Sequence, residues 1–314
     1  MTIAFVFPGQ GSQSVGMMAE LATAHTIVKS TFTEASDVLG YDLWRLTQDG
    51  PEAELNKTTK TQPALLASSV ATWRVWNEIS QIQAVMMAGH SLGEYSALVC
   101  SGAISFTDAI QLVADRGATM QDAVPEGTGS MAAVLGLEDK QIEGLCEQAA
   151  QGQVVSAANY NSFGQVVIAG HKEAVERAVE LAKEAGAKRT VILPVSVPSH
   201  CALMQKAADQ FAQRLDTVEF NQPNIPVLQN VDATIRENVE DIKLALQEQI
   251  WRPVLWVKTI QEMVNKNVST VIECGPGKVL SGLIKRIDRG LKVLPIFDPS
   301  SMQKALVELG ELTD

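Results

Sequence analysis

The chain has 314 residues, of which 46% are hydrophobic and 19% charged, and its formal net charge is −11 at pH 7. This composition predicts a folded protein with a sizeable core and argues against disorder. The acidic balance disfavours general binding to nucleic acid or to anionic membranes, and no apolar run approaches the ~20 residues of a membrane span.

The N-terminus and the cysteines indicate a cytoplasmic protein. Residues 1–7 carry no basic group, so they predict a first strand at 3–7 rather than a signal peptide. The four cysteines show neither a C-x-x-C pair nor a metal-ligand spacing, and reduced thiols without a metal site are the simplest interpretation. These cysteines are Cys100, Cys146, Cys201 and Cys274.

Strand-like runs alternate with helical patterns through most of the chain. Near-continuous apolar runs predict strands at 3–7, 84–88, 191–195, 227–230, 268–273 and 291–295. Apolar residues at helical spacing predict helices at 61–78 and 254–265. Strands that are apolar on both faces suit a parallel sheet covered by helices, so the sequence predicts an α/β fold.

The segment between residues 129 and 195 has a different rhythm. It predicts strands at 129–137, 154–159, 165–170 and 190–195, with helices at 139–151 and 173–185. This β-α-β-β-α-β order is that of a ferredoxin-like unit. We therefore expect a small ferredoxin-like domain inserted into a larger α/β domain; one continuous sheet is the alternative.

One G-x-S-x-G pattern lies at residues 89–93, where the sequence is Gly-His-Ser-Leu-Gly. It follows a predicted strand and precedes a helical run at 94–99. Such a strand–turn–helix lifts the serine hydroxyl out of the sheet and points the helix N-terminus at it. Ser91 is therefore a candidate nucleophile, and the backbone N–H of Leu92 is a candidate donor to an oxyanion. A buried serine in a chance match is the alternative.

The glycine-rich segment at 8–13 follows the first strand. It lacks the third glycine of a dinucleotide-binding motif and the Gly-Lys-Ser/Thr of a P-loop, so nucleotide binding is poorly supported. A glycine-rich turn at the end of a strand can instead offer a second backbone N–H to the same oxyanion.

A serine nucleophile needs a base within hydrogen-bond reach, and the chain has four histidines. We favour His200 because it lies where the chain returns from the predicted insert, across the mouth between two domains. A structural histidine at a helix start is the alternative. His90 is expected to point away from Ser91. No carboxylate lies in the loop of His200, so we expect a backbone carbonyl or an amide as the third group, which weakens a plain hydrolase.

Arg116 lies on a predicted helix over 108–123. At about 100° per residue it falls between Leu112 and Met120, at the edge of the apolar stripe. A half-buried guanidinium needs an anionic or strongly accepting partner, and its planar geometry matches a carboxylate. An internal salt bridge, or a side chain that reaches solvent, is the alternative.

Taken together, these motifs resemble those of the malonyl-CoA:acyl carrier protein transacylases of fatty acid synthesis. The resemblance covers essentially the whole chain and rests on residues 7–13, 89–94, 116, 159–162, 197–200, 247–249 and 273–277. It implies an α/β-hydrolase-like catalytic domain with a mostly parallel sheet at 1–125 and 198–314. The ferredoxin-like insert then occupies 126–197. No cofactor is implied, because the CoA thioester and the phosphopantetheine arm are substrates.

The resemblance also implies roles for single residues. Ser91 would be the nucleophile, and His200 its base and later its acid. Arg116 would bind the free carboxylate of the malonyl group. Gln249 would orient His200 through its main-chain carbonyl. The backbone N–H groups implied in the oxyanion hole are those of Gln10 and Leu92.

These roles predict a ping-pong transfer. Ser91 takes the malonyl group from malonyl-CoA and passes it to the phosphopantetheine thiol of acyl carrier protein. A serine esterase or thioesterase that uses the same turn is one alternative, and a non-catalytic acyl-binding protein is another. A cysteine nucleophile at Cys201 is disfavoured, because a residue adjacent to His200 rarely faces the same point.

A carrier protein of the family is acidic, so docking on this acidic chain would need a local basic patch. A solvated charge run is an equally good interpretation of the candidates. The candidates are Lys188, Arg189, Lys278, Lys285, Arg286, Arg289 and Lys292.

Overall fold

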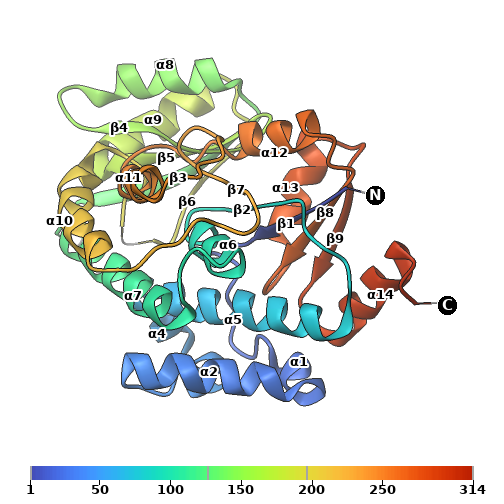
Figure 1. Ribbon diagram of the computed structural model, residues 1–314. Coiled ribbons are helices and arrows are strands. Elements are labelled where there is room, and N and C mark those ends of the chain that lie inside the picture. Colours follow the sequence, from blue (N-terminus) through green and yellow to red (C-terminus); the bar gives the residue numbers. More distant parts are fainter. Residues whose placement is uncertain (1, 126, 196, 313–314) are drawn as a thin grey trace.

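The computed structural model describes residues 2–125, 127–195 and 197–312. Two separate sheets organise them, with helices packed around the larger one (Figure 1). Two residues at the predicted domain boundaries, Glu126 and Ser196, lie outside the described residues.

The larger sheet has five strands in the order β7-β2-β1-β8-β9, and each paired neighbour runs parallel. This agrees with the predicted α/β class and its mostly parallel sheet. The strands are β1 (Ile3–Phe7), β2 (Met86–Gly89), β7 (Val227–Leu228), β8 (Thr270–Cys274) and β9 (Lys292–Ile296).

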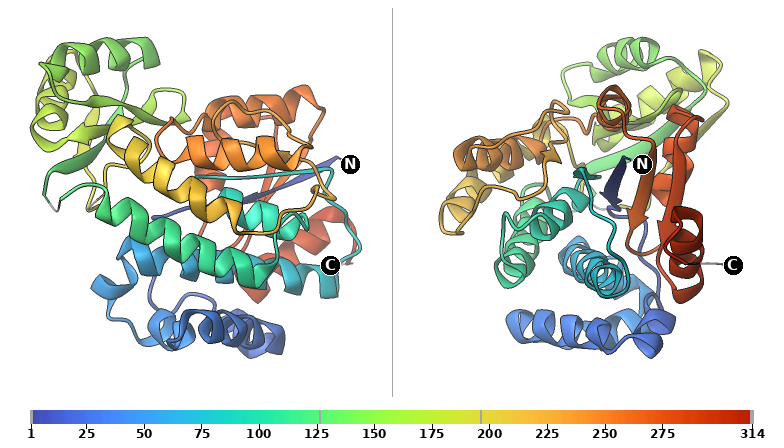
Figure 2. Two further views of the ribbon diagram at one scale, coloured as in Figure 1. Left: turned by 60° about the vertical axis from the view of Figure 1, so that its left-hand side comes forward. Right: turned by 45° about the vertical axis from the view of Figure 1, so that its right-hand side comes forward.

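Helices cover both faces of the larger sheet (Figure 2). In β1, Phe5 and Phe7 face one apolar cluster, whereas Ala4 and Val6 face a second, because successive side chains of a strand point to opposite faces. The second cluster is formed with α12 (Trp256–Asn265) and α13 (Val279–Ile287). The remaining helices around this sheet are α1 (Ala19–Ala24), α2 (Thr26–Leu39), α3 (Leu43–Asp49), α4 (Glu52–Leu55), α5 (Thr58–Ile79), α6 (Gly93–Cys100), α7 (Phe106–Asp122), the 3-10 turn η1 (Ala202–Met204), α10 (Gln205–Asp216), α11 (Val239–Gln249) and α14 (Pro299–Leu309).

The smaller sheet has four strands in the order β4-β5-β3-β6, and its paired neighbours run antiparallel. Its elements follow one another along the chain as strand, helix, strand, strand, helix, strand. An apolar cluster of its own joins the sheet to the two helices. These elements are β3 (Gly129–Leu135), α8 (Asp139–Ala150), β4 (Val155–Ser162), β5 (Gln165–His171), α9 (Lys172–Glu184) and β6 (Arg189–Ile192).

The described strands other than β1 each differ from their predicted bounds at one end or both; β2 begins at Met86 rather than at residue 84, and β3 ends at Leu135 rather than at residue 137. β6 ends at Ile192 rather than at Val195, because the N–H of Val195 turns back to the carbonyl oxygen of Leu193 instead of pairing with β3. β7 ends at Leu228 rather than at residue 230, because the N–H of Asn230 donates to a side chain instead of to a neighbouring strand. β4 continues to Ser162, so the turn before β5 is shorter than predicted.

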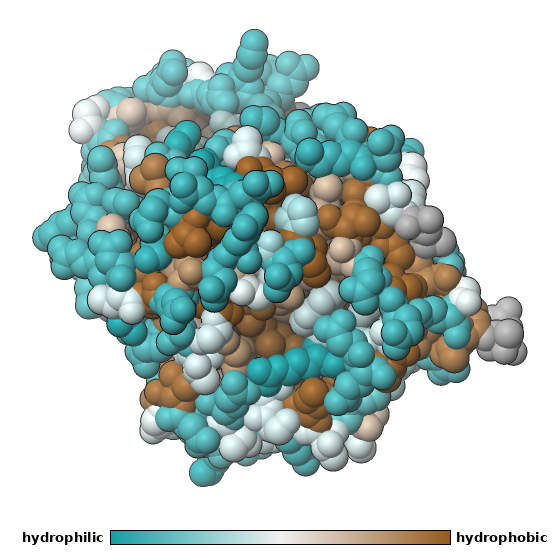
Figure 3. All heavy atoms as spheres, in the orientation of Figure 1, coloured by the Kyte–Doolittle hydropathy of each residue, from teal (hydrophilic) through white to brown (hydrophobic). Residues whose placement is uncertain are grey.

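Hydrophilic residues cover much of the face shown in Figure 3, with apolar residues visible between them. Within the described ranges, no helix is both long enough and apolar enough to cross a membrane.

Candidate active site

Ser91 lies on a tight turn between β2 and α6, at the carboxyl end of the parallel sheet. Its φ of 50° is in the left-handed region, which residues other than glycine rarely adopt. Two residues later the chain must pass the end of β1 very closely, because a Cβ on Gly93 would lie 2.0 Å from the carbonyl oxygen of Phe7. The motif therefore has a glycine where the helix crosses the neighbouring strand.

His200 lies next to the serine hydroxyl. Its Nε2 is 2.9 Å from Oγ of Ser91, and its Nδ1 is 2.7 Å from the carbonyl oxygen of Gln249. Because a carbonyl only accepts, Nδ1 carries the proton and Nε2 is free to accept from the serine. The third position behind the histidine is thus a main-chain carbonyl, as expected from the missing acid. His90, in contrast, turns away and contacts Oδ1 of Asn161 through Nε2 at 2.7 Å.

The environment of His200 favours its neutral form. The side chain is 3% exposed, and burial together with the positive charge of Arg116 lowers its pKa to about 3. A neutral imidazole can take a proton from the serine hydroxyl without first losing one to solvent.

Arg116, on α7, points into the same centre. Its Nη1 donates to Oε1 of Gln62 at 2.9 Å, and its Nη2 donates to Oε1 of Gln249 at 2.9 Å and to Oγ of Ser91 at 3.3 Å. The side chain is only 2% exposed, so the predicted half-buried position was wrong. A helical wheel does not show that α5, which carries Gln62, covers this edge of α7.

The partners of Arg116 are neutral oxygens. In the described part of the chain no carboxylate lies within ion-pair distance of its guanidinium, although a buried cation is costly without an anion. The group is therefore held in place by amides while its charge stays available to a bound anion.

A cavity of about 180 Å³ brings these groups together. The loop after β1 reaches the serine turn backbone to backbone, since a Cβ on Gly9 would lie 2.4 Å from the carbonyl oxygen of His90. The smaller sheet and the segment that follows it form the opposite wall. The residues that line the cavity include Gln10, Ser91, Leu92, Arg116 and His200 on one side, and Met131, Asn159, Asn161, Val167, Leu193 and Val195 on the other.

Comparison with known proteins gives the family of this chain. Residues 4–295 match the family model described as an acyl transferase domain. The chain belongs to the acyl transferase family. A malonyl CoA-acyl carrier protein transacylase of Escherichia coli (strain K12) is 58% identical over 303 residues, which cover 96% of this chain and 98% of that protein. The protein of the same name from Bacillus subtilis (strain 168) is 44% identical over 313 residues, covering 99% and 98%.

Solved structures agree with the sequence comparison. An acyl carrier protein S-malonyltransferase from Vibrio cholerae superposes with a TM-score of 0.95 at 57% identity, covering 97% of this chain and 100% of that one. A malonyl-transacylase in complex with a type II PKS acyl-carrier protein gives a TM-score of 0.97 at 56% identity, covering 98% and 100%. The resemblance inferred from the motifs is thereby confirmed for this acyl transferase.

Three polar residues of the acyl transferase site were given no role by the sequence analysis: Gln62, which accepts from Arg116, Asn230 and Glu94. Asn230 accepts from the N–H of Ser91 at 2.7 Å and donates to the carbonyl oxygen of Gly89 at 2.7 Å. Glu94, fully buried in the first turn of α6, accepts from the N–H of Asn230 at 2.9 Å. A glutamate in the first turn of a mostly buried helix was the only signal, and Asn230 gave none.

The motif at 273–277, which had no chemical role in the sequence analysis, has a structural one. The buried carboxylate of Glu273 accepts from the N–H groups of Leu280 and Ser281 at 2.9 and 2.7 Å. It therefore caps the N-terminus of α13 and fixes this helix to the end of β8.

The basic residues predicted for docking do not all behave alike. Lys285 and Arg286 are exposed on α13, and Nη1 of Arg286 donates to Oε1 of Gln165 on β5 at 2.6 Å. Lys292 instead forms an ion pair with Glu308 at 2.6 Å, which leaves it a poor candidate for a partner. The other candidates, Lys188, Arg189, Lys278 and Arg289, are exposed.

Proposed function

We propose that this chain transfers the malonyl group from malonyl-CoA to the phosphopantetheine thiol of acyl carrier protein, through a malonyl ester of Ser91. The observation that carries this proposal is the guanidinium of Arg116 in the cavity that holds Ser91 and His200. A serine–histidine pair alone is suited to any acyl group, whereas a buried cation beside it selects an acyl group that ends in a carboxylate. The homologues carry names that state the same transfer.

In the first half-reaction, Oγ of Ser91 attacks the thioester carbon while its proton passes to Nε2 of His200. The backbone N–H groups of Gln10 and Leu92 stabilise the oxyanion of the tetrahedral intermediate. Its collapse breaks the carbon–sulfur bond, and the CoA thiolate leaves with the proton from His200. The carboxylate of the malonyl group pairs with Arg116 throughout.

In the second half-reaction, the phosphopantetheine thiol takes the place of CoA. Nε2 of His200 accepts the thiol proton, and the sulfur attacks the ester carbon. The intermediate collapses to malonyl thioester and the serine hydroxyl, which recovers the proton from His200. The carbonyl of Gln249 holds the imidazole in one tautomer through both halves.

The two sheets support an assignment of two domains with different roles. We assign 1–125 and 198–314 to an α/β-hydrolase-like catalytic domain and 126–197 to a ferredoxin-like insert, on the strand order and element order of the two sheets. The insert supplies one wall of the cavity, which limits the access of water to the ester. A cytoplasmic location stays a prediction.

An intact-mass experiment tests the proposed function. The protein is incubated with malonyl-CoA alone, and we expect a persistent malonyl adduct that is absent from Ser91→Ala and that disappears when acyl carrier protein is added. Rapid release of free malonate without a carrier would favour a thioesterase. Unchanged transfer by Ser91→Ala would overturn the covalent mechanism.

For the carrier protein, we propose docking on exposed basic residues on and just after α13, and at and just before the start of β6. These are Lys285, Arg286, Arg289, Lys188 and Arg189. Reversing the charge of Lys285 and Arg286 should weaken transfer to the carrier and spare formation of the acyl-enzyme, because docking is needed only in the second half-reaction. Unchanged transfer kinetics in this double variant would remove the proposed surface.

A further inference from the structure

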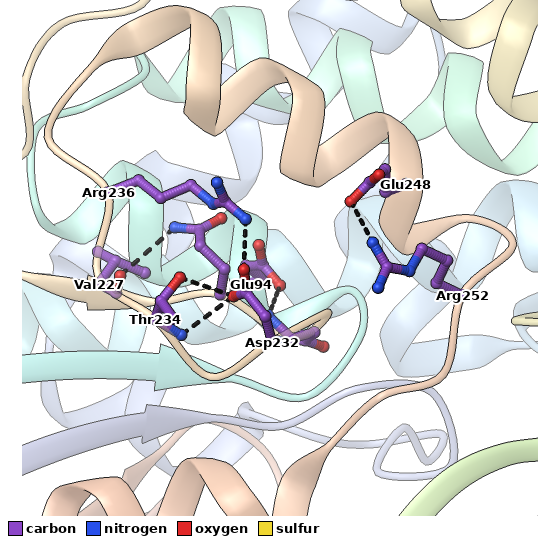
Figure 4. A network of polar contacts seen from close by, with 9 residues as sticks. Glu94, Val227, Asp232, Thr234, Arg236, Glu248 and Arg252 are labelled. Carbon is purple, nitrogen blue, oxygen red and sulfur yellow. Dashed lines mark hydrogen bonds and ion pairs between the residues drawn. The ribbon is translucent and has the colours of Figure 1, made fainter.

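Glu94 is a buried carboxylate to which the mechanism above gives no role. It lies three residues after the nucleophile and is 0% exposed. Its Oε2 accepts two hydrogen bonds, from the N–H of Asn230 at 2.9 Å and from Nε2 of Gln249 at 2.9 Å. Figure 4 shows this carboxylate beside the loop that carries Asp232, with Arg236 paired to Asp232.

Gln249 connects Glu94 to all three reacting groups. Its main-chain oxygen accepts from Nδ1 of His200 at 2.7 Å. Its side-chain Nε2 also donates to the carbonyl oxygen of Ser91 at 2.9 Å, and its Oε1 accepts from Nη2 of Arg116 at 2.9 Å. The orientation of one amide therefore affects the nucleophile and the group that faces the substrate carboxylate.

A primary amide has a donor end and an acceptor end of nearly the same shape, so packing alone does not choose between its two orientations. The observed orientation gives both N–H bonds of Gln249 an acceptor, in Ser91 and Glu94, and gives Arg116 an oxygen. The reverse orientation would place an NH₂ group against the guanidinium and an oxygen against two oxygens. The acceptor at Glu94 thus favours the productive orientation.

The second bond of Glu94 acts on the serine turn itself. Glu94 accepts a hydrogen bond from the backbone N–H of Asn230. The side chain of Asn230 in turn accepts from the N–H of Ser91 and donates to the carbonyl oxygen of Gly89. The left-handed backbone of Ser91 is unfavourable for a non-glycine residue, so it needs such support. One carboxylate oxygen thereby connects the loop after β7 to the nucleophile and to the end of α11.

We propose that Glu94 is a positioning residue, whose acceptor oxygen fixes the side chain of Gln249 and the backbone of Asn230 and so aligns Ser91 with Arg116. The inference rests on the proposed function, because it assigns Arg116 to the malonyl carboxylate. The proposal concerns the acceptor and not the charge of Glu94. Its other oxygen, Oε1, has no hydrogen-bond partner among the described residues, so a proton there would leave Oε2 free to accept.

Electrostatics are consistent with a role that tolerates either protonation state. Burial raises the pKa of Glu94 to about 7, against the opposing effects of its bonds from Gln249 and Asn230 and the charge of Arg116. The negative charge of Asp232 raises it further. Near neutral pH both forms of the carboxyl group are therefore populated, and Oε2 is an acceptor in both.

Two substitutions separate positioning from packing. Glu94→Met fills a similar volume without an acceptor, and Glu94→Gln restores an acceptor oxygen. The readout is the rate of Ser91 acylation by malonyl-CoA divided by the rate with acetyl-CoA, measured by intact mass on one sample. This ratio is independent of the folded fraction, and a merely structural defect would leave it unchanged.

We expect Glu94→Met to lose malonylation by about 100-fold, the scale of a misplaced reacting group, and to lower the malonyl-to-acetyl ratio at least about tenfold. Glu94→Gln should recover most of both. Glu248→Met is the matched control. Glu248 directly precedes Gln249, and its carboxylate forms a partly exposed ion pair with Arg252, so both readouts should stay within about threefold. Circular dichroism and thermal unfolding check folding, with Glu94→Leu as the second variant if Glu94→Met does not fold.

Three results would be decisive. A wild-type malonyl-to-acetyl ratio in folded Glu94→Met would show that Glu94 only fills space, and would overturn the proposal. An equal loss in Glu94→Gln and Glu94→Met would assign the effect to charge rather than to the acceptor, and would overturn it as well. Failure of the wild-type protein to form a malonyl adduct on Ser91 would instead contradict the proposed function, so the two failures are distinguishable.

Discussion

In the proposed function the cation of Arg116 faces the acyl group, and replacing Arg116 with alanine removes this cation while keeping the side chains of Ser91 and His200. The guanidinium is 2% exposed and donates to the neutral oxygens of Gln62, Gln249 and Ser91. A malonyl carboxylate in this cavity would then be left without a counter-charge. Truncating one partner of such a buried charge pair costs about 2–5 kcal/mol, which corresponds to a loss of about 30- to 5,000-fold in malonylation.

A second effect of Arg116→Ala acts on every substrate alike. Burial is the largest cause of the lowered pKa of His200, and the positive charge of Arg116 is the second largest. Its removal therefore raises that pKa toward its usual range and changes the fraction of neutral base at a given pH. The ratio of malonyl-CoA to acetyl-CoA acylation cancels this shared effect and isolates the contact with the carboxylate.

The assay is quenched-flow acylation read by intact mass, with malonyl-CoA and acetyl-CoA run side by side. Arg214→Ala is the control, because it removes an arginine that pairs at the surface with Asp115, the neighbour of Arg116, and such pairs contribute about 0–1 kcal/mol. We expect its ratio to match that of the wild type. Equal losses on both substrates in Arg116→Ala would refute the carboxylate role.

Three further predictions concern the serine turn and its base. Gly93→Ala should abolish acylation and lower the melting temperature, because its Cβ would overlap the carbonyl oxygen of Phe7; wild-type activity in a thermally stable variant would contradict the close approach. Asn230→Ala should slow acylation by malonyl-CoA and acetyl-CoA by a similar factor of about 10–100, since it frees the backbone of Ser91 but does not touch the carboxylate site, and a change confined to malonyl-CoA would argue otherwise. The pKa of His200 is lowered to about 3 in the folded protein, so only the unfolded chain binds the extra proton as the pH falls below about 6.5. Acidification from about pH 7 to about pH 4.5 should therefore lower the free energy of unfolding of the wild type by about 2.5 kcal/mol more than that of His200→Gln, as measured by urea unfolding. Identical pH slopes for the two proteins would contradict the buried neutral imidazole.

The residues that sequence could identify are those whose chemistry is local. Ser91 could be identified because its turn needs glycines at fixed positions. His200 could be identified because the chain has only four histidines and this one lies where the chain returns from the predicted insert. The parallel sheet followed from runs of apolar residues, since a strand buried on both faces has no polar alternation.

What sequence could not supply are contacts between distant segments. The side chain of Gln249 meets the carbonyl of Ser91 across 158 positions, and no periodicity encodes that meeting. Burial of Arg116 was underestimated because its cover comes from α5, and Glu94 resembled an ordinary first-turn glutamate. The length of β7 was overestimated, because the backbone N–H of Asn230 donates to Glu94 instead of to a neighbouring strand.

The cavity has two walls that differ in how they are built. On one side the loop after β1 and the serine turn touch backbone to backbone at Gly9 and Gly93, with no side chain between them that a substitution could shorten. On the other side Met131, Val167 and Leu193 line the space. A change in the acyl chain length or branching that the cavity accepts therefore requires exchange of side chains, on the smaller sheet or at Met120 on α7, because the backbone contacts of the serine turn offer no side chain to exchange.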